Sequence, residues 1–152
     1  LGSNLFATHY TITNLYQIGA IQDGNDTEAL VSALAGQSLT LASKWDGPGN
    51  PGEWTGPSGE VTEFTFVWNG DGVITHIVVK ASTHWILYGL YTPLQTGDSQ
   101  DIVQSLITNS QDIPQAISHL TGYTGTAVPE PATLMLLGLG LIAVPLAKKY
   151  TF

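Results

Sequence analysis

Residues 132–147 form a run of sixteen residues without a charge, and this run constrains the chain more than any other feature. As a helix it would be about 24 Å long, at about 1.5 Å per residue, shorter than the roughly 30 Å hydrocarbon layer of a membrane. Burying its large apolar side chains is worth on the order of 15–25 kcal/mol. We therefore expect a hydrophobic helix that lies in lipid or against protein. The alternative is a core helix of the same domain, although such a helix normally has a polar stripe that this run lacks.

The residues that flank this run form a distinctive pattern. Pro129, Glu130 and Pro131 come before it, and Lys148 and Lys149 come after it. The two prolines keep the segment around Glu130 extended and outside the helix, where an enzyme can reach it. The apolar residues of the run are interrupted by glycines, in the order Leu134, Leu136, Leu137, Gly138, Leu139, Gly140, Leu141 and Ile142.

This order resembles the PEP-CTERM protein-sorting domain of exopolysaccharide-producing bacteria. The resemblance implies export to the cell surface or the extracellular space, with transient retention by the hydrophobic helix. It also implies that Pro129, Glu130 and Pro131 are the sorting motif recognised by an exosortase, a membrane cysteine peptidase, and that Lys148 and Lys149 are the basic flank. The partners expected during export are therefore the exosortase and the membrane.

The charges of the chain exclude one class of partner. Residues 1–131 contain all twelve carboxylates but only two lysines, so this portion carries 2 − 12 = −10. Such a surface repels phosphate backbones, and we expect no nucleic-acid partner. The chain has no cysteine, so it has neither a disulfide framework nor a thiolate zinc site.

The body of the chain is predicted to be all-β. Residues 61–68 alternate so that Phe64, Phe66 and Trp68 share one face, and the turn residues 69–72 predict a hairpin into a strand at 73–80. A third consecutive strand is predicted at 84–91. Weaker strand patterns cover residues 8–18, 37–45 and 115–123.

About six strands favour a small β-sandwich, jelly-roll-like, as the ectodomain at residues 1–120. A linker at 121–128 and the sorting segment at 129–152, with its C-terminal hydrophobic helix, complete the predicted organisation. Two short helices are predicted inside the body, at 29–36 and at 99–108, where Ile102, Val103, Leu106 and Ile107 have helical spacing.

No convergent set of catalytic residues is recognisable, and we expect a protein that is not an enzyme and needs no cofactor. Ser58 lacks the Gly-x-Ser-x-Gly spacing of a nucleophile elbow. His76 and His84 could face each other across a hairpin and share a metal, although cross-strand packing is the ordinary reason for such a pair. The best metal candidate is a weak calcium site at Asp23, Asn25, Asp26 and Glu28, whose oxygen atoms suit Ca²⁺. The same residues also suit a turn and the N-cap of the helix after them.

These features favour a structural role. We expect an exported subunit that assembles with copies of itself into an extracellular filament or matrix, with the C-terminal helix as the assembly or anchoring element. The alternative is a carbohydrate-binding module of the cell surface or matrix, in which Trp45, Trp54 and Trp85 stack on extracellular polysaccharide. The same tryptophans would serve equally well as core residues or loop anchors.

Overall fold

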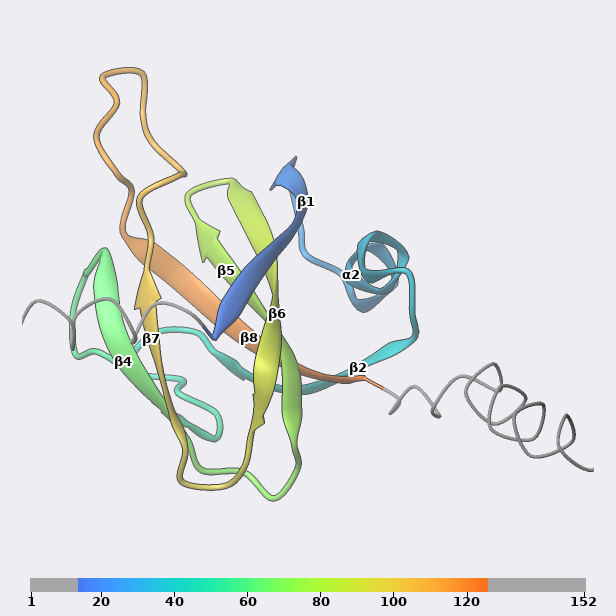
Figure 1. The fold of residues 1–152 in the computed structure, drawn as a ribbon. Coiled ribbons are helices and arrows are strands. Elements are labelled where there is room, and N and C mark those ends of the chain that lie inside the picture. The colour runs from blue at the N-terminus through green and yellow to red at the C-terminus, as the bar shows by residue number, and fades with distance from the viewer. Residues whose placement is uncertain (1–13, 126–152) are drawn as a thin grey trace, which may run out of the picture.

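A computed structural model describes residues 14–125, which form two antiparallel β-sheets and one helix (Figure 1). In chain order the elements are β1 (Leu15–Asp23), α2 (Glu28–Ala35), β2 (Leu39–Trp45), β3 (Trp54–Thr55), β4 (Glu63–Trp68), β5 (Ile74–Ala81), β6 (His84–Leu94), β7 (Ser99–Val103) and β8 (Ile117–Gly125). The predicted all-β class is therefore confirmed. The predicted C-terminal helix lies outside the described residues.

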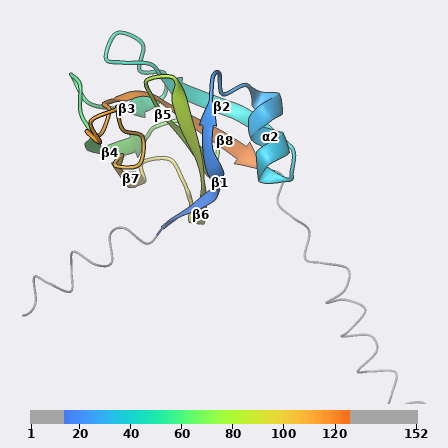
Figure 2. The ribbon, with the colours of Figure 1, turned by 90° about the horizontal axis from the view of Figure 1, so that it is seen from above.

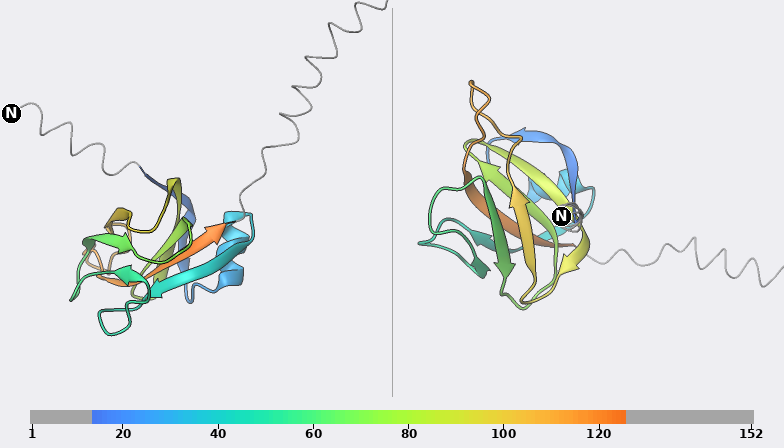
Figure 3. Two further views of the ribbon diagram at one scale, coloured as in Figure 1. Left: turned by 90° about the horizontal axis from the view of Figure 1, so that it is seen from below. Right: turned by 60° about the vertical axis from the view of Figure 1, so that its left-hand side comes forward.

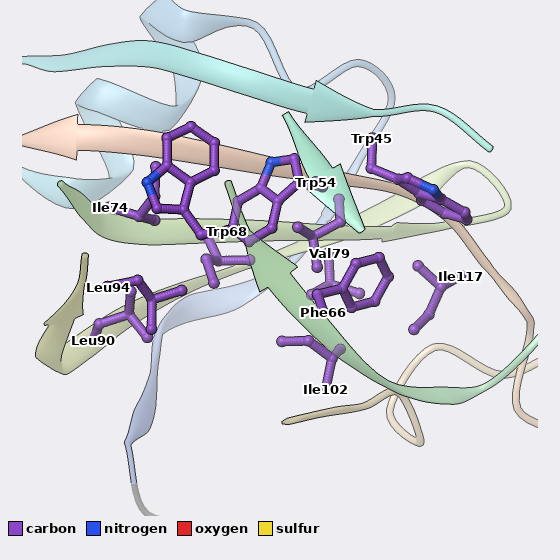
Figure 4. Packing of buried hydrophobic residues seen from close by; sticks show 12 residues of the cluster. Trp45, Trp54, Phe66, Trp68, Ile74, Val79, Leu90, Leu94, Ile102 and Ile117 are labelled. Carbon is purple, nitrogen blue, oxygen red and sulfur yellow. The ribbon is translucent and has the colours of Figure 1, made fainter. Parts of the chain in front are cut away.

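The strands divide unequally between the two sheets. One sheet has five strands in the order β1-β6-β5-β8-β2, and the other has three in the order β3-β4-β7. The two sheets pack around one core, in which Phe66 and Trp68 of the small sheet meet Ile74 and Val79 of the large one (Figure 4). The jelly-roll-like arrangement stays a prediction.

The helix α2 covers the outer face of the large sheet. It connects β1 to β2, which are the two edges of that sheet, so the connection crosses the sheet from one side to the other (Figure 2). Thr27 caps the helix by accepting a hydrogen bond from the Leu30 amide, and Gly36 ends it in the left-handed conformation with φ 69°. Val31 is its fully buried residue and packs against Val78 and Tyr123. The predicted helix at 29–36 and its N-cap are confirmed.

Two elements differ from the prediction. The predicted hairpin between 61–68 and 73–80 does not form, because β4 and β5 belong to different sheets and β4 pairs with β3 and β7. The second predicted helix, at 99–108, is wrong as well. Its first half is β7, in which Gln100 and Ile102 alternate into the core with the period of a strand. The hairpin of β5 and β6 is present as predicted.

The last strand begins and ends two residues later than predicted. It continues through Gly125, so residues 121–125, expected to open the linker, pair with β2 and β5 inside the sheet. As a central strand, β8 has backbone partners on both sides. It can lie close to the small sheet here because Gly122 has no side chain and lies under the Trp54 ring. The remainder of the predicted linker lies outside the described residues.

Gly122 is a position where a side chain of the small sheet comes very close to the backbone of the large one. A Cβ atom there would lie 2.6 Å from the Trp54 ring and 2.9 Å from Ile74 Cδ1. The ring cannot withdraw freely, because its Nε1 donates a 3.2 Å hydrogen bond to the Ser43 carbonyl. We predict that Gly122→Ala lowers the free energy of unfolding by about 1–3 kcal/mol, measured by urea denaturation.

The matched control is Gly59→Ala, because a Cβ atom at Gly59 would meet no atom within 4 Å. It should leave the urea midpoint close to that of the natural chain. Equal destabilisation by both substitutions would mean that the close approach of Trp54 to β8 is not what requires glycine.

Candidate functional site

The region of functional interest is the end of β8, from which the chain continues into the sorting segment predicted by the sequence. This end lies beside β2 and α2 (Figure 3, left). The final residue, Gly125, donates a 2.7 Å hydrogen bond from its amide to Thr75 Oγ1 of β5. On the preceding residue, Thr124 Oγ1 donates a 2.8 Å hydrogen bond to the Val73 carbonyl. The last two residues of β8 are thus fixed to a central strand and to the loop before it.

Thr75 belongs to a chain of hydrogen bonds that we call the exit network. It is formed by the side chains of Gln37, Thr75 and His76 and by the backbone of Tyr123 and Gly125. The His76 ring nitrogens lie 3.2 Å from Gln37 Nε2 and 2.8 Å from Thr75 Oγ1. Because the amide nitrogen of Gln37 only donates, His76 Nε2 must accept, so the proton of a neutral ring resides on Nδ1. Thr75 Oγ1 then accepts from His76 and Gly125 and donates to the Tyr123 carbonyl at 3.4 Å.

Electrostatics favour the same neutral state. His76 is buried, and desolvation of its charged form lowers the pKa of its ring below 6.5. Nearby, burial is the main cause that raises the pKa of the Tyr123 hydroxyl, and the charges of Asp26 and Glu28 add to it. A neutral His76 and a neutral Tyr123 therefore belong to the folded state at physiological pH.

The weak calcium candidates do not converge on one point. Asp23 pairs with His84 on the neighbouring strand, and Glu28 accepts a 3.0 Å hydrogen bond from the Leu41 amide. Asp26 and Asn25 both face Lys80, with Nζ 3.9 Å from Asp26 Oδ1 and 3.4 Å from Asn25 Oδ1. No cluster of three or more metal-binding side chains occurs among residues 14–125. The prediction of a turn and an N-cap fits these positions better, with Thr27 as the capping residue.

The Asp26 and Lys80 pair has a structural role. Both side chains are nearly buried, and Thr121 Oγ1 also donates to Asp26 Oδ2 at 3.4 Å. The pair therefore fastens the loop before α2 to the centre of the large sheet. His119 lies opposite Lys80 in the sheet, and its Nδ1 lies 2.6 Å from Asp46 Oδ1 without hydrogen-bond geometry. Burial, followed by the charge of Lys44, lowers the pKa of His119.

The predicted histidine pair is not brought together. His76 lies opposite Gly89 near one end of the β5–β6 hairpin, and His84 lies opposite Ala81 at the other end. The three tryptophans considered for sugar stacking are also not available, because Trp45, Trp54 and Trp85 are each only 2% exposed. The prediction of an exposed aromatic platform is therefore wrong for these residues, and their interpretation as core residues is correct.

An open groove lies on the surface of the domain, where the loop after β2 faces the start of β8. Its volume is about 530 Å³. Trp45 lines the groove but is almost fully buried, and the polar residues of the lining include Glu60, Ser82, Gln115 and Ser118. Such a groove has hydrogen-bonding groups but no exposed aromatic face.

The comparison with protein families identifies the segment that comes after β8. The PEP-CTERM protein-sorting motif matches residues 127–148, which begin two positions after the end of β8. The chain therefore carries a signal that marks proteins for export to the cell surface or extracellular space and for sorting by exosortase. No curated protein and no solved structure matches the chain.

The match includes the predicted sorting motif Pro129, Glu130 and Pro131 and the apolar residues from Leu134 to Ile142, as well as Lys148. All of these residues, and Lys149, lie outside the described residues. In the part that the structure does describe, no helix has the length and apolar character needed to cross a membrane. The sorting segment was recognisable from sequence because its residues are contiguous, whereas nothing in the sequence linked Gln37, His76 and Gly125.

The neutral state of His76 predicts a pH dependence of stability. Because the folded-state pKa is lowered, the unfolded chain takes up a proton near pH 6.5 while the folded domain resists it. The contribution to stability is therefore complete above pH 6.5 and is lost as the pH falls below that value. We predict a lower melting temperature at pH 5 than at pH 7.5, and a smaller difference in the His76→Gln variant.

His119 has a lowered pKa too and contributes in the same direction, so the variant should keep part of the dependence. His119→Gln in the same background should reduce it further. A His76→Gln variant with the full pH dependence of the natural chain would show that the exit network does not depend on a neutral His76.

Proposed function

We propose that this protein is an exported structural subunit that assembles with copies of itself into an extracellular filament or matrix. The proposal includes no catalytic activity and no cofactor. One observation carries it: an apolar, uncharged segment at 132–147 comes directly after an acidic domain. The segment gains free energy only by leaving water, while the domain carries enough negative charge to remain soluble around it.

The fixed end of β8 supports this proposal. A subunit held through its C-terminal segment transmits any displacement of that segment to the domain through Gly125, and Gly125 is bonded to a central strand. A loosely attached tail would anchor the domain without orienting it. The exit network therefore suits a subunit whose orientation in an assembly matters.

The tail is the element to remove in the first test. A chain that ends at Thr126 should be a soluble monomer in light scattering, whereas the full chain should form polymers visible by electron microscopy. The reason is that truncation removes the apolar surface that drives association while leaving every described strand intact. Polymers of the same form from the truncated chain would show that the tail is not the assembling element.

A control separates apolar association from loss of the sorting motif itself. Replacing Pro129 and Pro131 by alanine keeps residues 132–147 and should leave polymers intact, although processing by exosortase would change. A full chain that remains monomeric at all concentrations, in the absence of detergent, would contradict the proposed function.

The carbohydrate-binding alternative depended on exposed tryptophans, and these tryptophans are buried. The groove beside Trp45 is the place where a polysaccharide would have to bind, through Glu60, Gln115 and Ser118. Glycan-array binding by the domain that is abolished in Glu60→Ala would favour this alternative. Polymers without glycan binding favour the structural role.

A further inference from the structure

The edges of the two sheets are protected to different degrees. Strand edges present unpaired backbone groups to which another strand can add, and proteins usually block them. On β2, Ser32 Oγ accepts from the Leu39 amide at 3.0 Å and donates to the Leu39 carbonyl at 3.3 Å. Glu28 accepts from the Leu41 amide at 3.0 Å, and Trp54 Nε1 donates to the Ser43 carbonyl at 3.2 Å. The β2 edge is thus closed by side chains of α2 and β3.

The β7 edge is largely open. Beyond its ends, the Gln104 amide donates to the Thr62 carbonyl and the Trp68 amide donates to the Asp98 carbonyl. Hydrogen-bonded and unbonded pairs alternate along antiparallel strands, so in this register Gln100 and Ile102 bond to β4. The backbone groups of Ser99, Asp101 and Val103 point away from β4. Within the described residues one side chain caps them: Gln100 Nε2 donates to the Asp101 carbonyl at 3.0 Å.

The surroundings of the β7 edge are largely apolar. A cleft of about 180 Å³ lies between the two sheets here, and it is lined by Leu15, Tyr88, Asp101, Ile102 and Val103. Val103 is 54% exposed, although its side chain is large and apolar. A strand added to β7 would cover Val103 and place alternate side chains at this cleft.

The chain itself contains a segment of matching chemistry. The predicted strand at 8–18 is realised from Leu15 onward as β1, and its first half, residues 8–13, lies outside the described residues. That half contains no carboxylate, and Tyr10 and Ile12 alternate with Thr11 and Thr13, the pattern of a strand. A second β7 edge would be a poorer partner, because pairing two such strands brings two Asp101 carboxylates together.

The position of Asn14, the first described residue, favours pairing of residues 8–13 with another copy of the chain. Asn14 lies next to β7, because its Nδ2 donates a 3.0 Å hydrogen bond to Gln100 Oε1. Its carbonyl accepts from the Tyr91 amide, which holds Asn14 in line with β1 at the edge of the large sheet. The line of β1 runs in the plane of the large sheet, whereas β7 belongs to the small one. Pairing of residues 8–13 with β7 of the same domain would require the chain to leave the line of β1 at Asn14, and pairing with β7 of another copy would not.

We propose that residues 8–13 of a second copy add as a strand to β7, next to Ser99, Asp101 and Val103. This inference rests on the proposed function: the apolar segments at 132–147 bring copies together, and the strand addition determines how neighbouring copies contact each other. Donor segment and acceptor edge are different surfaces of one chain, so each added copy offers a new free edge. Such a head-to-tail contact propagates into a filament wherever the rotation between copies does not close a ring.

The first test is Val103→Pro in the full chain. The Val103 amide makes no hydrogen bond to β4, so proline leaves the pairing within the domain intact and removes a donor that the added strand needs. We expect polymer mass in sedimentation to fall on the order of tenfold, because a backbone hydrogen bond is lost and the proline ring obstructs the edge. Val103→Thr keeps the amide and should polymerise like the natural chain.

The second test does not depend on tolerance of proline. Because the chain has no cysteine, disulfide formation can report single contacts without background. Full chains carrying Thr11→Cys and Val103→Cys are mixed, and the control mixture pairs Thr11→Cys with Thr40→Cys on the closed β2 edge. We expect the first mixture to give the mixed dimer in large excess over the control.

Each outcome decides between the two proposals. If the natural chain polymerises but Val103→Pro polymerises equally and the two mixtures cross-link alike, the strand-addition contact is wrong and the proposed function stands. A Thr11→Cys, Val103→Cys double variant that cross-links within one chain at high dilution would also overturn the contact, because the donor would then be the chain's own. If the natural chain forms no polymer at all, the proposed function itself fails.

Discussion

The contact between the Trp54 ring and the backbone at Gly122 is the constraint on which the rest of the domain depends. Trp54 belongs to the short strand β3, and its ring packs against Phe66 and Trp68, with centroids 6.5 and 5.0 Å away. Its Nε1 reaches the backbone of β2 in the other sheet. One side chain thus joins both sheets, and it reaches that position only because β8 has no side chain at residue 122.

The same contact determines the course of the chain at the C-terminal end of the domain. Because Gly122 allows β8 to run under the aromatic cluster, the strand continues to Gly125 and pairs on both sides. The export signal therefore begins directly after a central strand. The position of that strand also brings Tyr123 under α2, where Val31 packs against it.

Parts of this structure could be predicted from sequence, and the differences have physical causes. The alternation of Phe64, Phe66 and Trp68 identified β4 and its buried face, because period two is a local property. The partners of β4 were not predictable from the turn residues. The turn after Trp68 leads into the other sheet and not back along β4 as in a hairpin. There the Trp68 Nε1 donates to the Gly72 carbonyl at 2.7 Å. Residues 99–108 have helical spacing of apolar residues, but the first five of them pair with β4 and therefore form the strand β7. The sorting segment was recognisable because it is contiguous, whereas the exit network joins residues that are far apart in the chain.

The attachment of the export signal to β8 has a mechanical consequence. Tension directed along the axis of β8 at Gly125 would load a strand that has β5 on one side and β2 on the other. The hydrogen bonds on both sides are then sheared together and share the load, whereas a strand pulled from its side would release its bonds one at a time. Resistance to forced unfolding is governed by the rate of crossing that barrier. A domain tethered in this way is suited to carry tension at a cell surface.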